Sequence, residues 1–190
     1  MYKLCQTEQS AFRQRQLEEG LLKIMLHRHY EEISVSDLCE ILEVPRKSFY
    51  RYFSGKDGAL LALIDHTLMD YDVYTTMNGS AGTMSQQQIM EQIFSYWITQ
   101  KPLLDALAYS SLSGLLVQRA LERIKEIETL PNFIQIADKQ LREYGTMFTV
   151  CGMMSLIIRW HHDGFAKSAQ EMARLAVQLF SESIFAAGNK

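Results

Sequence analysis

The sequence contains few of the residues that build cross-linked or metal-stabilised folds. Three cysteines, Cys5, Cys39 and Cys151, lie far apart in 190 residues, and their number is odd. They show none of the paired spacings of a disulfide framework or a zinc site. We therefore expect a protein of the reducing cytoplasm, with no metal site and no cofactor.

Long apolar runs and a strong excess of one charge are also lacking. The longest uncharged apolar stretch, residues 147–158, has 12 residues, whereas a membrane helix needs roughly 20. The first residues lack the apolar run of a secretory signal, and charged residues follow at once. The net charge is −3, so any attraction to nucleic acid must come from a local basic surface. We expect no membrane partner.

Proline is scarce too, with three residues at positions 45, 102 and 131. Between them, apolar residues recur at helical spacing among good helix formers, and we find no convincing alternating strand. The sequence therefore predicts an all-α fold, with helices over residues 8–29, 35–42, 45–52, 57–74, 86–100, 102–111, 115–128, 134–162 and 168–187. A break near Gly145 stays open for the helix over 134–162. Residues 77–85, rich in Gly, Ser and Thr, predict a loop.

Two short helices early in the chain have the features of a helix-turn-helix. Ser34 and Asp37 have the spacing of a capping box at the start of the first helix, and the fixed φ of Pro45 suits the first turn of the second. On a helical wheel, the second helix has an aromatic face and a basic face. The two faces hold, respectively, Phe49, Tyr52 and Phe53, and Lys47, Tyr50 and Arg51.

Positive charge is concentrated on this second helix. Residues 44–56 contain four cations and no acid, whereas residues 1–56 as a whole carry nine cations and eight acids. A solvated basic face on a small helix would have the same composition. The coincidence of the turn, the aromatic face and the cations favours an element that places side chains in the major groove of DNA.

The segment SVSDLCEILEVPRKSFYRYFSGKDGALLALI resembles the signature of the TetR family of regulators, and the match covers about residues 17–64. The resemblance implies an N-terminal three-helix DNA-binding domain over residues 1–56 and a C-terminal helical ligand-binding and dimerisation domain over residues 57–190. It also implies a function: a transcription regulator, a repressor, that binds a pseudo-palindromic operator in double-stranded DNA as a homodimer and is not an enzyme.

The resemblance further implies which residues contact DNA. Phosphate contacts are expected from the start of the second helix, at Ser34 and Ser36. Base readers are expected at Arg46, Lys47 and Ser48, further phosphate contacts at Tyr50, Tyr52 and Lys56, and either role at Arg51. The sequence departs from the family pattern at Glu43, which stands where glycine is usual. A non-glycine residue in a left-handed turn costs roughly 1 kcal/mol or more, and this one places an anion near the DNA.

The C-terminal region carries apolar stripes with two alternative roles. An aromatic and methionine-rich set suits an adaptable pocket for a small apolar effector, although plain core is the commoner use of such residues: Trp97, Tyr109, Met147, Phe148 and Cys151. A stripe at helical spacing on the last helix suits a dimer interface, or burial within one subunit: Ala169, Met172, Ala173, Ala176, Leu179 and Phe180. The adjacent Trp160 is expected to join this interface. The end of the chain weakly resembles the TetR subgroup associated with dihydroxyacetone kinase operons.

Catalytic residues are not expected. His161 and His162 are adjacent, so on a helix they point about 100° apart and cannot face one metal ion. Phosphate-binding glycine loops and nucleophile elbows are absent. Two alternatives to an effector-controlled regulator stay open: a regulator whose C-terminal domain binds a protein, and a DNA binder without an effector. A closed apolar cavity would favour the small molecule, and a filled core with an exposed apolar surface would favour the protein partner.

Overall fold

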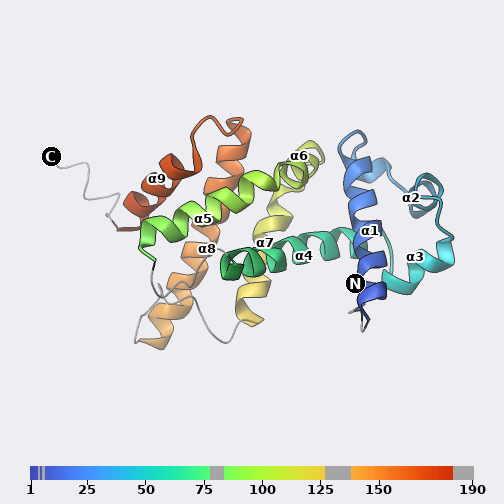
Figure 1. The fold of residues 1–190 in the computed structure, drawn as a ribbon, viewed down its shortest axis with the longest axis horizontal. Coiled ribbons are helices and arrows are strands. Elements are labelled where there is room, and N and C mark those ends of the chain that lie inside the picture. The colour runs from blue at the N-terminus through green and yellow to red at the C-terminus, as the bar shows by residue number, and fades with distance from the viewer. Residues whose placement is uncertain (4, 6, 78–83, 127–137, 182–190) are drawn as a thin grey trace. The chain divides into compact units, whose positions relative to one another are not determined.

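Helices make up the regular structure of the chain. The computed structural model describes residues 1–3, 5, 7–77, 84–126 and 138–181 (Figure 1). Over these residues, the elements are α1 (Glu8–Met25), the short 3-10 helix η1 (Tyr30–Glu32), α2 (Val35–Ile41), α3 (Arg46–Tyr52), α4 (Lys56–Met77), α5 (Gln86–Thr99), α6 (Lys101–Tyr109), α7 (Ser113–Glu126), α8 (Lys139–His162) and α9 (Ala169–Ser181). An isolated antiparallel bridge joins Tyr2 and Phe53. The predicted all-α fold is confirmed.

Several helices begin at polar residues that supply their caps. Thr7, Ser34, Ser85 and Asp138 each accept a hydrogen bond from a backbone N–H in the first turn of α1, α2, α5 and α8. Such caps satisfy N–H groups that have no partner within the helix. The starts of these helices are therefore determined by local sequence.

Helix ends differ from the predictions in a few places. The first helix ends at Met25 and not near residue 29, because the N–H groups of His27 and Arg28 both bond to the Ile24 carbonyl and close the last turn. No break occurs at Gly145, and α8 is continuous. The predicted ends at residues 127–128, 134–137 and 182–187, and most of the predicted loop, lie outside the described residues.

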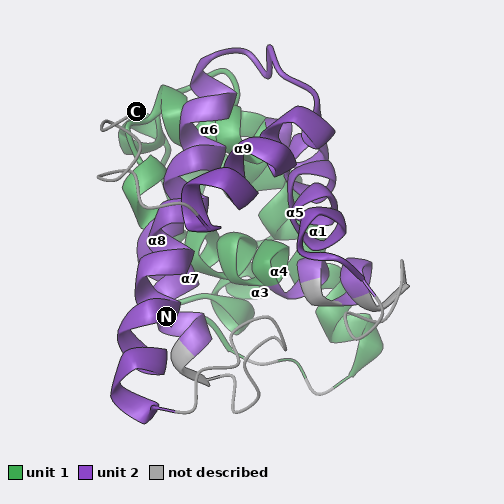
Figure 2. Ribbon diagram, turned by 90° about the vertical axis from the view of Figure 1, so that its left-hand side faces the viewer, with its two compact units in different colours: residues 1–68, 102–115 green, residues 69–101, 116–190 purple. Residues whose placement is uncertain are grey.

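The chain forms two compact units (Figure 2). The first comprises residues 1–68 and 102–115, so α1, η1, α2 and α3 belong to it together with the first part of α4 and nearly all of α6. The second comprises residues 69–101 and 116–190. This grouping differs from a simple cut at residue 56, and the predicted functional division into residues 1–56 and 57–190 stays a prediction.

Each unit has its own buried apolar core. In the first unit, side chains with 1% exposure or less include Leu21, Met25, Leu38, Phe49 and Phe53. In the second unit, Phe94, Leu116, Ile157 and Ala173 are fully buried, and α9 packs along α5. Burial of this kind supplies most of the free energy that holds short helices together. None of the helices in the described ranges has the length and apolarity that crossing a membrane requires.

Candidate nucleic-acid interface

A complete capping box begins α2. The Ser34 hydroxyl accepts a hydrogen bond from the Asp37 N–H at 3.1 Å, and the Asp37 carboxylate accepts one from the Ser34 N–H at 2.9 Å. The bond from the Ser34 backbone lowers the pKa of the Asp37 carboxyl. Ser34 and Ser36 are both exposed. Because a capping hydroxyl that accepts still has its own O–H to donate, Ser34 keeps the capacity to bind a phosphate.

The turn between α2 and α3 places Glu43 in the left-handed region, with φ of 52°. The Val44 N–H bonds to the Cys39 carbonyl at 2.9 Å and the Glu43 N–H bonds to the Glu40 carbonyl at 3.1 Å. These two bonds form the helix ending in which glycine is the usual left-handed residue. The sequence prediction of a non-glycine residue in a left-handed turn is confirmed.

Helix α3 is divided into a buried face and an exposed face. Pro45 is its N-cap, and the carbonyl of Pro45 accepts from the N–H groups of Ser48 and Phe49. Phe49 is fully buried and its ring lies 5.1 Å from the Phe53 ring. The side chains left exposed are Arg46, Lys47, Tyr50 and Arg51. The aromatic face thus anchors the helix while the cations remain available to a polyanion.

Tyr52 is the predicted phosphate contact that the fold packs away. It is 6% exposed, and its ring lies 6.2 Å from that of Phe53. Tyr50, in contrast, is 44% exposed and stands edge-on to Phe49. Of the two tyrosines, Tyr50 is therefore the more accessible side chain. The helical wheel already placed Tyr52 on the aromatic face and Tyr50 on the basic face, and only the family resemblance suggested a phosphate contact for Tyr52.

Lys56 ties the start of α4 to η1. Its Nζ donates to the Tyr30 carbonyl at 2.8 Å and to the Glu31 carbonyl at 3.3 Å, and lies 4.4 Å from the centre of the Tyr30 ring. The Tyr30 hydroxyl donates to Asp57 at 2.5 Å, and burial with this hydrogen bond raises the tyrosine pKa. A lysine has three N–H donors, so one remains for a phosphate oxygen.

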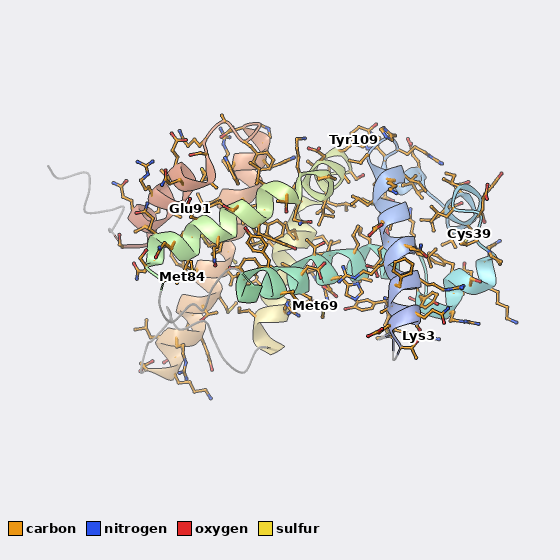
Figure 3. The ribbon with its side chains drawn as sticks, viewed as in Figure 1. Lys3, Cys39, Met69, Met84, Glu91 and Tyr109 are labelled. Atoms are coloured by element: carbon orange, nitrogen blue, oxygen red, sulfur yellow. The ribbon has the colours of Figure 1, made fainter. Side chains whose placement is uncertain are left out.

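A contact that is distant in sequence supports the same corner of the first unit. The Tyr30 N–H donates to the Ser110 hydroxyl at 2.9 Å, and the His29 and Tyr109 rings stack at 4.1 Å with an interplanar angle of 11°. Tyr109, labelled in Figure 3, was predicted as a ligand contact. The structure places its ring against His29, in the first unit, whereas the other predicted ligand residues belong to the second. Its role as a ligand contact stays a prediction. No local signal in the sequence pointed to this pairing.

The other predicted ligand residues lie in the second unit with contrasting exposure. Trp97 is 2% exposed and stands edge-on to Tyr96 at 5.7 Å. Phe148 is 70% exposed and Met147 is 41% exposed, while Cys151 is half-buried. The structure therefore encloses Trp97 and leaves Phe148 on the surface. Their role as effector contacts stays a prediction.

The predicted dimer stripe is partly used within one chain. Trp160 is 2% exposed and donates from Nε1 to the Lys167 carbonyl at 2.9 Å. Three further members are also buried where α9 packs along α5: Met172, Ala173 and Ala176. Ala169, Leu179 and Phe180 keep part of their surface exposed. Only these last three still have surface to offer a partner.

An apolar face of α8 is exposed beside this stripe. Leu141, Tyr144 and Phe148 are 60%, 65% and 70% exposed, and their spacing places them on one side of the helix. The Phe148 ring lies 6.4 Å from that of Phe180 on α9. Large exposed apolar side chains gathered in this way mark an interaction surface more often than isolated ones do.

The polar end of α8 shows no sign of a metal centre. Asp163 is its C-cap and accepts a hydrogen bond from Arg159 Nε at 3.0 Å. His162 is exposed, with Nδ1 3.8 Å from Asp163. Among the residues that the structure describes, no three His, Cys, Asp or Glu side chains are grouped so as to hold a metal ion.

Comparison with known proteins identifies the fold. No model of a protein family and no curated protein matches the sequence. Several solved structures match most of the chain, and three of them are regulators. The dihydroxyacetone kinase operon activator DhaS has 13% identity and a TM-score of 0.55, over 88% of this chain and 93% of its own. The fatty acid degradation regulator FadR from Bacillus halodurans has 11% identity and a TM-score of 0.55, over 90% and 96%.

The third structure is a TetR-family transcriptional regulator from Bordetella parapertussis 12822, with 17% identity and a TM-score of 0.50 over 92% of this chain and 96% of its own. The matches extend over nearly the full length of each protein. The chain therefore has the fold of TetR-type regulators, and the resemblance found in residues 17–64 is confirmed at the level of the fold.

Proposed function

We propose that this protein is a DNA-binding transcription regulator of the TetR type, which binds a pseudo-palindromic operator as a homodimer. The observation that carries the proposal is the division of α3 into a buried aromatic face and an exposed face with three cations, Arg46, Lys47 and Arg51. A rigid, basic helix after a tight turn is what the major groove admits. The overall charge of −3 makes this local surface the source of attraction to DNA.

Different residues are expected to carry affinity and specificity. Lys47 is exposed near the start of α3, where recognition helices contact bases. A lysine contact to guanine is worth about 1–3 kcal/mol of discrimination against other bases. Tyr50 and Lys56 are expected to hold phosphates, which position the protein without reading sequence. Arg46 and Ser48 are further base-reading candidates, and Arg51 has either role.

The first experiment establishes the operator. Purified protein is mixed with sheared DNA of its own genome, and the retained fragments are sequenced. We expect enrichment of a two-fold symmetric motif with half-sites one helical turn apart, roughly 34–36 Å. If no motif is enriched and binding shows no salt dependence, the proposed function is wrong.

The second experiment separates base readers from phosphate contacts. Binding of Lys47→Ala and Lys56→Ala is measured by fluorescence anisotropy on the operator and on a scrambled duplex at several salt concentrations. Lys47→Ala should relax preference at one symmetric position, and Lys56→Ala should weaken both duplexes and reduce the salt slope by about one. Lys23→Ala, an exposed lysine in the last turn of α1, serves as the control. Equal losses by both variants on both duplexes would reject this division of roles.

We propose that the dimer forms through α8 and α9, with the exposed face of α8 at its centre. Two DNA readers must be held at a fixed separation, and Leu141, Tyr144 and Phe148 supply an apolar surface that the single chain leaves uncovered. Phe148→Glu should give a monomer in sedimentation. Phe12→Glu, which places the same charge at a phenylalanine of α1 that is 64% exposed, should remain a dimer. Substitution of Ala176 would test folding instead, because that residue is already buried.

We propose a small apolar effector as the controlling signal, with a protein partner as the alternative. The core of the second unit around Trp97 contains aromatic and methionine side chains, which suit the binding of an apolar molecule. If Phe148→Glu leaves the dimer intact, the exposed face of α8 is available to a protein partner, which supports the alternative. A panel of apolar compounds that raises the melting temperature and releases the operator would support the effector. Reporter expression with and without the protein decides between repression and activation.

A further inference from the structure

Residues 1–3 run antiparallel to the end of α3. The Lys3 N–H donates to the Tyr52 carbonyl at 2.9 Å, and the Ser54 N–H donates to the Met1 carbonyl at 3.0 Å. The Ser54 hydroxyl adds a second bond to the Met1 carbonyl at 2.8 Å. Backbone pairing therefore fixes this segment against the residues that follow the recognition helix.

Side-chain contacts from α4 hold the same segment. The Tyr2 hydroxyl donates to the Asp65 carboxylate at 2.8 Å, and Asp65 is 3% exposed. The Tyr2 ring stands edge-on to His66 at 5.8 Å. Gly58 leaves the space for it, because a Cβ at that position would lie 2.4 Å from the Met1 oxygen. A larger residue at position 58 would therefore displace Met1.

The position of Lys3 follows from this arrangement. Successive side chains of an extended segment point to opposite faces. Since Tyr2 points to α4, Lys3 points away from it, and Lys3 is exposed. Its backbone partner, Tyr52, directly follows the exposed Arg51 in sequence. Figure 3 labels Lys3 at the N-terminal end of α1.

We propose that Lys3 binds a DNA phosphate and extends the basic surface beyond the helix-turn-helix. The inference rests on the proposed DNA-binding function. The segment is held by its backbone and by Tyr2, so the lysine side chain is free to meet the sugar-phosphate backbone that flanks the end of α3. Phosphate contacts add affinity without sequence preference.

The test is the salt dependence of binding by Lys3→Ala. One lost phosphate contact lowers the slope of log affinity against log salt by about 0.9, which at 0.1 M salt corresponds to about an eightfold loss. The loss should be equal on the operator and on a scrambled duplex, and Lys3→Arg should keep the slope of the wild-type protein. The Lys3 variants should melt at the wild-type temperature, because the backbone pairing does not depend on that side chain.

Lys23→Ala is the matched control, and Lys47→Ala reports on the proposed function itself. Suppose that the wild-type protein binds DNA and that Lys47→Ala binds it more weakly. If Lys3→Ala then has the same affinity and salt dependence as Lys23→Ala, only the Lys3 inference is overturned. If the wild-type protein shows no salt-dependent binding, the proposed function and the inference both fail. A loss confined to the operator would also overturn the inference, since it would mark Lys3 as a base reader.

Discussion

Replacing Glu43 with glycine should raise the stability of the protein. Glu43 has φ of 52° in the turn between α2 and α3. A left-handed conformation costs a non-glycine residue roughly 1–2 kcal/mol, and the greater freedom of glycine in the unfolded chain offsets about 0.4–1 kcal/mol of that gain. The free energy of unfolding should therefore rise by about 0.5–1 kcal/mol. For a chain of this length, the melting temperature should rise by roughly 1–4 °C.

The same substitution should tighten DNA binding for a separate reason. Glu43 is an exposed anion in the turn that precedes α3, and a screened exposed charge is worth about 0.5 kcal/mol, or roughly a twofold to threefold change in affinity. Glu43→Ala removes the charge but keeps the left-handed strain. It should tighten DNA binding without the rise in stability expected of Glu43→Gly. Ser111→Gly, at a left-handed residue after α6 with φ of 58°, should raise stability and leave DNA binding unchanged.

Urea unfolding measures the first effect and fluorescence anisotropy at several salt concentrations measures the second. If Glu43→Gly is no more stable than Glu43→Ala, backbone strain at Glu43 does not lower the stability of the protein. If Glu43→Ala binds DNA no more tightly than the wild-type protein, the Glu43 charge does not weaken binding. The two variants thus separate strain from electrostatics at a single position.

Further predictions concern the first unit. Glu18 is fully buried and pairs with His66 at 2.8 Å. Glu18→Ala should therefore lower the free energy of unfolding by about 3 kcal/mol. A loss below about 1 kcal/mol in urea unfolding would contradict this. The pKa of Asp37 is lowered in the folded protein, so its carboxylate contributes stability at pH values above its unfolded pKa of about 4. This stability is lost as the pH falls through the lower folded pKa. Asp37→Asn should therefore flatten the acid dependence of the melting temperature, measured against pH. Ser110→Ala removes the acceptor of the η1 N–H and should lower unfolding free energy by about 1 kcal/mol.

The helix-turn-helix could be predicted from sequence because its signals are local. The Ser34–Asp37 capping box, the left-handed Glu43 and the aromatic face of α3 each depend on residues within a few positions of one another. Their interactions are satisfied inside one turn or one helix, so spacing is enough to identify them. The cations of α3 were also predicted to be exposed, since the opposite face holds the aromatic anchors.

Contacts across the chain could not be predicted in the same way. Ser110 bonds to the Tyr30 N–H across 80 positions, and Lys56 turns toward the Tyr30 and Glu31 carbonyls. A lysine at a helix start has the same sequence signature whether it meets a phosphate or a backbone carbonyl. Only the position of η1 beside α4 makes the carbonyls available, and no local pattern encodes that position.

The burial of the apolar stripe of α9 was determined partly by sequence and partly by tertiary structure. Periodicity by itself determined that Met172, Ala173 and Ala176 share one face that must leave water. Tertiary structure decided that α5 of the same chain covers this face, while Phe148 on α8 stays exposed. The physical reason is that the hydrophobic effect is non-directional: it requires an apolar face to be buried and does not specify against which surface.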